Sequence, residues 1–255
     1  MKGMSRTRAR RLVLTALAVA GLVLPGAPVV ASAHGPDGPT TQRLSMGTSV
    51  RGRPIPVLHR AFPPAEAARV RVVVIGSIHG DERAGLRVIR DLKQRNLPAN
   101  VDLWLVRTVN PDGVVADRRT NAHRVDLNRN FPYRWRSVDK GSATYSGPRA
   151  LSEPESRALK AFITTVQPQL VVTFHQPLYG VGANDKGMPV VRALAKGMRL
   201  PVKTFACTGV CHGSFTSWVN NRTPATAVTV ELGPSVPDAL VHRAAATILT
   251  VGSRG

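Results

Sequence analysis

The chain has 255 residues, of which 43% are hydrophobic, and it carries a formal net charge of +20 at pH 7. A surface this basic suits nucleic acid, anionic cell-wall polymers or acidic peptides. Only 5% of the residues are aromatic and no nucleic-acid-binding motif occurs, so the composition argues against nucleic acid as a partner.

Residues 1–33 have the parts of an export signal. A basic start is followed by the apolar run Leu12 to Leu24, by Pro25, and by the small-residue cleavage site at 31–33. The run is too short for a comfortable membrane-spanning helix, so a membrane anchor is the weaker alternative and no stable span is expected after cleavage. The pair Arg10-Arg11 fits twin-arginine export, but paired arginines are also ordinary in a Sec-type basic start.

Cleavage would leave about 222 residues, enough for one domain with a sizeable core. The signal contains only basic charges, so the mature chain keeps a net charge of about +15. Residues 34–41 are rich in Gly and Pro and are expected to be flexible, which leaves 42–255 as a single domain. We therefore expect a secreted, extracytoplasmic protein of the cell wall, with anionic wall polymers as candidate partners.

The rest of the chain alternates strand and helix patterns. Gly47 to Val57 alternates around a glycine-containing turn and predicts a hairpin. The further expected elements are strands at 70–75, 101–109, 170–174 and 225–232 and helices at 81–96, 152–167, 188–198 and 237–251. Alternation of this kind predicts an α/β fold with a largely parallel sheet.

Two connections carry recognisable signals. Asn110-Pro111-Asp112-Gly113 is a strong turn sequence, and we assign it no direct role beyond the turn. Ser152, with Glu155 three residues on, predicts a capping box at the start of a helix that Pro168 ends.

His79 and Glu82 are the first candidate site residues. They follow the apolar strand at 70–75 and precede a helix, so both side chains can point beyond the carboxyl end of the strand, where open α/β sheets place their sites. Imidazole nitrogen and carboxylate oxygen are zinc ligands, and a catalytic zinc needs one more protein ligand and an open position. The pair alone is a weak signal.

Four motifs together strengthen the case that His79 and Glu82 bind a metal ion. They are the stretch HGDE at 79–82, NPDG at 110–113, Arg119-Thr120-Asn121, and VDLNRNF at 125–131. In this order and spacing they resemble the zinc carboxypeptidases of the carboxypeptidase A superfamily, and the nearest branch is similar to the bacterial murein peptide amidases, which trim cell-wall peptides. The resemblance runs from about Gly47 to Gly233. It implies a mixed twisted sheet flanked by helices and one Zn²⁺ per chain.

The resemblance also assigns catalytic roles. His175, at the end of the strand 170–174, matches the third zinc ligand. Glu231 matches the general base, which takes a proton from water and passes it to the leaving amine; the alternative is a solvent-facing carboxylate at a strand end. Arg119 matches the arginine that stabilises the oxyanion, although Arg118 is adjacent and the choice between them stays open.

Asn128 and Arg129 match the pair that grips the terminal carboxylate of the substrate. A guanidinium meets a carboxylate in a two-pronged geometry that lysine cannot reproduce. This feature separates an enzyme that clips a chain end from one that cuts anywhere. We interpret Arg124 and Arg134 as solvated surface charges, with contact to an acidic peptide as the alternative.

Three further positions stay open. Cys207 and Cys211 are the only cysteines and could close a small disulfide loop in an exported protein, with zinc ligation as the weaker alternative. Tyr179 is the only tyrosine between His175 and Glu231 but lies too close to His175 to match the mobile tyrosine of the family. His212 is a candidate for substrate contact or for a structural role.

The hypothesis is therefore an exported zinc metallopeptidase that hydrolyses an amide next to a free carboxylate. The resemblance implies muropeptide as substrate and the bond between γ-D-glutamate and diaminopimelate as the target. The alternatives are a carboxypeptidase acting on ordinary L-peptides, a related deacylase, and a non-catalytic wall-binding module that kept the fold.

Overall fold

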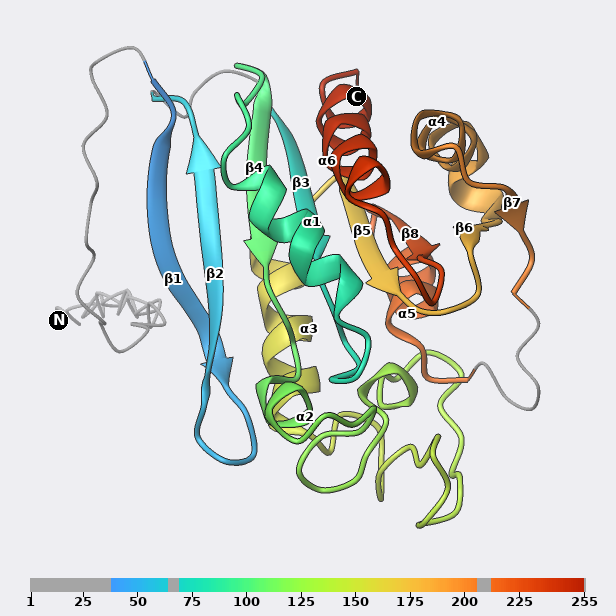
Figure 1. Ribbon diagram of the computed structural model, residues 1–255. Helices are drawn as coiled ribbons and strands as arrows, with labels where there is room; N and C mark the ends of the chain where they lie inside the picture. The colour runs from blue at the N-terminus through green and yellow to red at the C-terminus, as the bar shows by residue number, and fades with distance from the viewer. Residues whose placement is uncertain (1–37, 64–68, 206–211, 255) are drawn as a thin grey trace, which may run out of the picture.

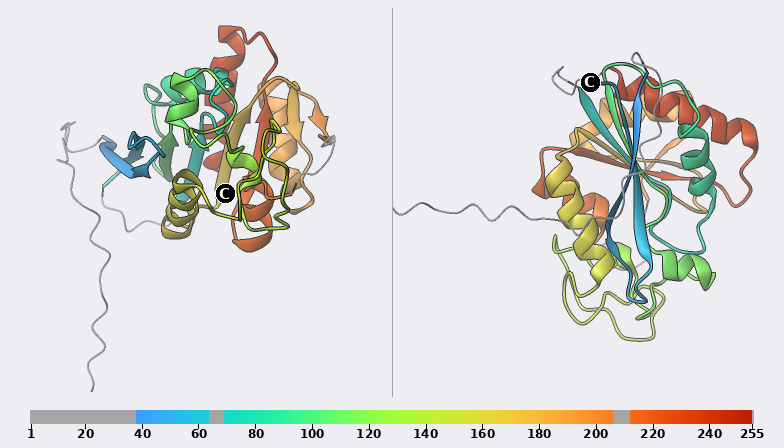
Figure 2. Two further views of the ribbon diagram at one scale, coloured as in Figure 1. Left: turned by 90° about the horizontal axis from the view of Figure 1, so that it is seen from below. Right: turned by 90° about the vertical axis from the view of Figure 1, so that its left-hand side faces the viewer.

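The structure is a computed structural model that describes residues 38–63, 69–205 and 212–254. Its centre is an eight-stranded sheet in the order β1-β2-β4-β3-β5-β8-β6-β7, covered by helices on both faces (Figures 1 and 2). The strands are β1 Thr40–Thr48, β2 Pro54–Ala61, β3 Val70–Ile75, β4 Val101–Val106, β5 Leu170–His175, β6 Gly180–Gly182, β7 Val202–Lys203 and β8 Thr226–Glu231.

The central strands β4, β3, β5 and β8 run parallel to one another. Strand β2 pairs antiparallel with both β1 and β4, and β6 pairs antiparallel with β8. The predicted α/β class, with a mixed and mostly parallel sheet, is confirmed. The parallel centre matters for function because it brings the carboxyl ends of β3, β5 and β8 to one edge.

The helices divide into two layers. They are α1 Ala84–Leu92, α2 Pro111–Val115, α3 Pro154–Val166, α4 Met188–Met198, α5 Phe215–Arg222 and α6 Asp238–Gly252, with short 3₁₀ turns η1 Leu127–Arg129 and η2 Asp185–Gly187. One core joins the sheet to α1, α4 and α6, and the other joins it to α3 and α5. Figure 2 shows these layers on opposite sides of the sheet.

Strand β3 explains why the central strands are apolar throughout. Val72 and Val74 face the core with α1, α4 and α6, whereas Val73 and Ile75 face the core with α3 and α5. All four are fully buried. A strand covered on both faces needs a continuous apolar run rather than an alternating one.

Several element ends differ from the sequence prediction. Strand β1 begins at Thr40, inside the segment 34–41 that was expected to be flexible. Helix α1 begins at Ala84 rather than at Asp81, because the preceding residues form the turn that carries His79 and Glu82. Strand β4 ends at Val106, short of the predicted end at 109.

The capping box predicted at Ser152 is wrong. Helix α3 starts after Glu153, which gives no side-chain cap. The Oε1 atom of Glu155 instead accepts a hydrogen bond from the backbone N–H of Val50 at 3.0 Å, and its Oε2 accepts one from Nδ2 of Asn121 at 3.1 Å. Glu155 therefore bonds to residues that are distant in the sequence and does not cap its own helix.

The assignment of NPDG as a turn alone is also wrong. Asn110 caps α2 by accepting a hydrogen bond from the backbone N–H of Gly113, and the buried carboxylate of Asp112 pairs with Arg53 of the β1–β2 hairpin. The segment therefore ties α2 to the hairpin.

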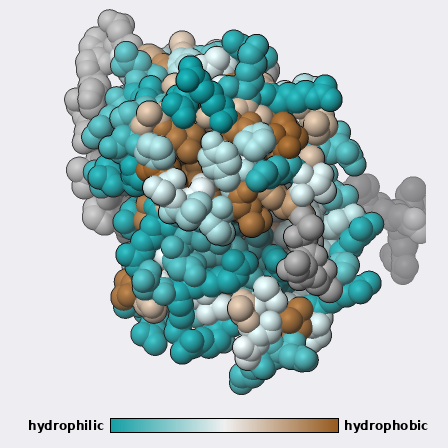
Figure 3. Space-filling view, turned by 45° about the vertical axis from the view of Figure 1, so that its right-hand side comes forward, coloured by the Kyte–Doolittle hydropathy of each residue, from teal (hydrophilic) through white to brown (hydrophobic). Residues whose placement is uncertain are grey.

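The surface of the protein is mostly hydrophilic in the face shown in Figure 3. Hydrophobic residues gather in the upper half of that view. Within the described part of the chain, no helix has the length and apolarity of a membrane span. The expected export signal at 1–33 lies outside the described residues.

Candidate active site

The turn between β3 and α1 carries the first two site residues. It packs tightly against α2: a Cβ atom added to Gly80 would lie 2.0 Å from the carbonyl carbon of Gly113. Gly80 is needed for this backbone approach, because any side chain there would push α2 away. The turn is thereby held with the side chains of His79 and Glu82 pointing inward, where both are buried.

His79, Glu82 and His175 converge at the carboxyl edge of the sheet. Nδ1 of His79 lies 2.8 Å from Oε1 of Glu82, Nδ1 of His175 lies 2.9 Å from Oε2 of Glu82, and the two Nδ1 atoms are 3.3 Å apart. Burial raises the pKa of Glu82, but the two histidines outweigh it and lower that pKa well below its usual range. The three groups form a compact set of facing donor atoms.

Asp126 orients the first of these histidines. This carboxylate is fully buried, and its Oδ1 accepts a hydrogen bond from Nε2 of His79 at 3.1 Å. Burial lowers the pKa of His79, yet the carboxylates of Asp126 and Glu82 raise it to about 9. Because Asp126 holds the Nε2 proton, Nδ1 is the nitrogen that faces Glu82 and His175 and that a metal ion would bind after Nδ1 loses its proton.

The triad could hold a metal ion. One ligand atom from each of its three residues lies within 4.8 Å of the others, and two imidazole nitrogens with one carboxylate are a ligand set that zinc takes in catalytic sites. The orientation of His79 by a buried carboxylate is the arrangement usual for a metal-binding histidine. The donor chemistry therefore fits zinc.

Asp126 also fixes the first arginine of the site. Its Oδ2 accepts hydrogen bonds from Nε and Nη2 of Arg119, at 3.0 and 2.9 Å, and Nη1 of Arg119 lies 3.3 Å from Oε1 of Glu82. Arg118 points elsewhere and donates to the backbone carbonyls of Thr120 and Asn121. The structure thus places Arg119, and not Arg118, beside the triad.

Asn128 and Arg129 lie in the 3₁₀ turn η1, which Asp126 caps through the N–H of Asn128. Oδ1 of Asn128 accepts a hydrogen bond from the N–H of Phe215, at the start of α5. Nη1 of Arg129 donates to the carbonyl of Asn128, and its buried Nε has no hydrogen-bond partner among the described residues. Burial lowers the pKa of Arg129, with the neighbouring Arg119 acting in the same direction.

Glu231 ends β8 directly beside the end of β5, where its Cα pairs with that of His175. The Oε2 atom of Glu231 accepts a hydrogen bond from the N–H of Leu178 at 3.3 Å. Burial raises the pKa of Glu231, against the opposing effect of His175. A carboxylate with a raised pKa in a cleft is suited to proton transfer.

A cleft of about 630 Å³ contains the predicted metal ligands, the predicted catalytic residues and the predicted carboxylate-binding pair. The triad, Arg119, Asn128, Arg129 and Glu231 all line it. Tyr179 does not: it is 46% exposed and has a positive φ of 52°. His212 lies in the turn before α5 and is likewise not among the lining residues, and the predicted disulfide between Cys207 and Cys211 lies outside the described residues.

Two residues of the site were missed from the sequence. Asp126 lies within VDLNRNF, and an acidic residue between apolar neighbours was the available signal. Gln176 gave no signal: its Oε1 accepts a hydrogen bond from the first N–H of α1 at Ala84, and its Nε2 donates to the carbonyl of Gly233. It clamps together the ends of the elements that carry the ligands and Glu231.

The fold and the cleft agree with one class of protein. The profile of the zinc carboxypeptidase family matches residues 37–178, more than half of the chain, and the chain belongs to this family. It is accordingly a hydrolase of the metallocarboxypeptidase type. The matched range includes the triad, Arg119, Asn128 and Arg129, whereas Glu231 lies beyond it.

Two sequence relatives share the name murein peptide amidase A. Murein peptide amidase A of Escherichia coli (strain K12) is 33% identical over 169 residues, which cover 62% of this chain and 69% of the relative. Murein peptide amidase A of Vibrio campbellii is 31% identical over 212 residues, covering 78% and 82%.

Solved structures agree with the sequence relatives. The crystal structure of a murein-tripeptide amidase from Escherichia coli O157 matches with a TM-score of 0.63 and 29% identity, covering 83% of this chain and 91% of that one. Carboxypeptidase A from Helicoverpa armigera shares the fold, with a TM-score of 0.69 over 86% and 68% of the chains, at 19% identity.

Proposed function

We propose that this protein is an exported, zinc-dependent amidase that hydrolyses the bond between γ-D-glutamate and diaminopimelate in muropeptides. One observation carries the proposal: a His-Glu-His triad and an arginine without a carboxylate partner share one cleft. The relatives that carry the name murein peptide amidase A support muropeptide as the substrate class.

Arg129 would bind the free carboxylate beside the scissile bond. Among the described residues it forms no ion pair, unlike Arg119, and its guanidinium lines the cleft. A partly buried guanidinium with unused donors is a strong site for a two-pronged carboxylate contact. Asn128 lines the cleft beside it, and its side-chain N–H₂ has no partner among the described residues.

The triad would hold zinc through Nδ1 of His79, Nδ1 of His175 and the carboxylate of Glu82. When bound, zinc polarises the scissile carbonyl and acidifies water. Glu231 would take a proton from the attacking water and deliver it to the nitrogen of the leaving amine. Its place at the end of β8, adjacent to the end of β5, sets this carboxylate beside the triad.

Arg119 would stabilise the carbonyl oxygen as it gains negative charge. Its contacts with Asp126 hold the guanidinium in place before substrate arrives. A donor that is already oriented loses little free energy to reorganisation during the reaction.

Export is proposed from the sequence of residues 1–33. The mature protein would begin at His34 and act in the cell wall, where its positive charge suits anionic polymers. The intact mass of the protein recovered from the cell envelope tests the cleavage site, and a mass that retains residues 1–33 contradicts it.

The substrate is tested with the tripeptide L-Ala-γ-D-Glu-diaminopimelate and purified mature protein, followed by mass spectrometry. We expect release of free diaminopimelate that stops on chelation and returns with zinc. Glu231→Gln protein is the matched control for contaminating activity. If the tripeptide stays intact while ordinary L-peptides lose their C-terminal residues, the specific substrate is wrong and the protein is a general carboxypeptidase.

A further inference from the structure

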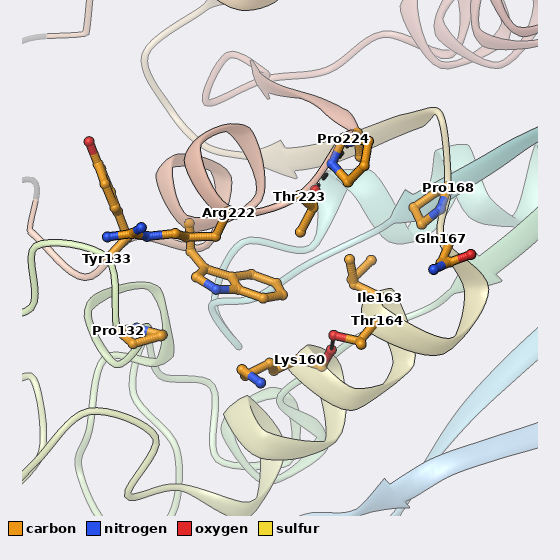
Figure 4. Close-up of a pocket in the computed structure, with 12 residues that line it drawn as sticks. Pro132, Tyr133, Lys160, Ile163, Thr164, Gln167, Pro168, Arg222, Thr223 and Pro224 are labelled. Carbon is orange, nitrogen blue, oxygen red and sulfur yellow. Dashed lines mark hydrogen bonds between the residues drawn. The ribbon is translucent and has the colours of Figure 1, made fainter.

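A second cavity lies between helices α3 and α5, apart from the catalytic cleft. It has a volume of about 490 Å³, within the range of ligand-binding pockets. Figure 4 shows Lys160 and Thr164 of α3 at the pocket, with Arg222, Thr223 and Pro224 on the opposite side. None of its lining residues lines the catalytic cleft.

The charges of this α3–α5 pocket are all positive. Lys160 and Arg222 line it, and it has no acidic side chain in its wall. Neither cation has a carboxylate partner among the described residues. The guanidinium of Arg222 instead lies over the ring of Tyr133, with its Cζ atom 5.4 Å from the ring centroid. Two unpaired cations in a concave site attract an anionic ligand.

The floor of the pocket is apolar. Ile163 and Ala225 are each 1% exposed, and Trp218 is 4% exposed. The pocket therefore combines an apolar floor with positive charge, which suits a ligand with methyl groups and carboxylates.

Helix α5 is the wall between this pocket and the catalytic cleft. Trp218 and Arg222 face the pocket, whereas Ser217 and Asn220 of the same helix line the cleft. On the other side, Pro132 and Tyr133 of the pocket directly follow the segment that carries Asn128 and Arg129. A ligand in the pocket would therefore lie behind the substrate-binding wall.

We propose that the α3–α5 pocket is a second binding site for an acidic peptide, taken to be a neighbouring stem peptide of the same wall polymer. Its carboxylates would meet Lys160 and Arg222, and its alanine methyl group would lie on the apolar floor. This identification of the ligand rests on the proposed function. Two linked sites that each hold a stem would raise the affinity for the polymer above that for one peptide.

The test measures binding of L-Ala-γ-D-Glu-diaminopimelate to zinc-loaded Glu231→Gln protein by isothermal titration calorimetry. We expect two peptides per chain. Adding Lys160→Gln and Arg222→Gln should leave one, whereas the control Arg192→Gln, which removes an exposed positive charge on α4, should leave two. Lys160→Gln alone should raise the Kd of the second bound peptide by about tenfold or more. Circular dichroism of each variant should show an unchanged fold.

One peptide per chain in the Glu231→Gln protein that still binds after Lys160→Gln and Arg222→Gln are added would overturn the proposal, as would two peptides in that background. A glycerol-phosphate oligomer that binds the pocket where the tripeptide does not would also reject the peptide. These outcomes are separate from the proposed function, because hydrolysis by the wild-type protein is measured independently. A chain that cleaves the tripeptide but binds it independently of Lys160 and Arg222 fails this inference alone.

Discussion

His79 donates a hydrogen bond from Nε2 to Oδ1 of the buried Asp126, over 3.1 Å. The same carboxylate receives two hydrogen bonds from Arg119 and caps the turn that carries Asn128 and Arg129. One buried anion therefore fixes a metal-binding histidine, the arginine beside the triad and the start of the carboxylate-binding turn. Its substitution should disturb the site without removing any ligand atom.

Asp126→Asn should weaken zinc binding by about 10- to 100-fold. A carboxamide has only one acceptor oxygen, so it cannot accept hydrogen bonds from both His79 and Arg119 in the way that the carboxylate does. Competition with a chromophoric chelator measures this effect independently of turnover. Asp102→Asn is the matched control, since Asp102 pairs with His59 on β2, outside the cleft. Equal zinc affinity in the two variants would show that Asp126 does not orient the ligand.

Glu231→Gln should retain zinc and substrate while lowering kcat by about 100-fold or more. The amide keeps the size of the carboxylate and can still accept the hydrogen bond from Leu178, but it cannot take a proton from water. Zinc content and turnover are measured on the same sample. His79→Ala should lose both zinc and activity, which separates a missing ligand from a missing base. A near-normal rate for Glu231→Gln would remove Glu231 from the mechanism.

Arg129→Lys should lower kcat/KM by about tenfold or more for a peptide with a free terminal carboxylate. A lysine preserves the charge but loses the two-pronged contact. For the same peptide with its terminus amidated, the wild-type and variant rates should converge. Arg124→Lys, at an exposed position, is the control and should leave both rates unchanged. A loss of equal size on both substrates would contradict carboxylate recognition.

Local patterns in the sequence predicted the fold class, and the family resemblance supplied most of the residues that gather in the cleft. The apolar run of β3 and the order of the motifs placed His79 and Glu82 at a strand end, and the resemblance supplied His175 and Glu231. Contacts between segments far apart in the sequence were not predictable. Gln176 clamps α1 to the end of β8, and Gly80 is required by the backbone of Gly113, yet neither contact leaves a local pattern.

Glu155, predicted to belong to a capping box, is another residue whose contacts lie far away in the sequence. Its burial leads to a prediction about pH. It is fully buried beside Glu153, with hydrogen bonds from Val50 and from Asn121 of the Arg119-Thr120-Asn121 motif. Burial is the main cause that raises the pKa of Glu155, and the neighbouring Glu153 adds to it, above the ordinary value of 4.5. The folded state therefore binds this proton more tightly than the unfolded state.

The contribution of Glu155 to stability should consequently rise as the pH falls from neutral toward 4.5, because protonation relieves the cost of its buried charge. At higher pH the cost is fully present. Thermal unfolding of zinc-loaded protein across this range measures the effect, and subtracting the profile of Glu155→Gln removes contributions from other groups. The difference between wild type and variant should shift in favour of the wild type as the pH falls. A difference that is independent of pH would show that Glu155 titrates alike in the folded and unfolded chains.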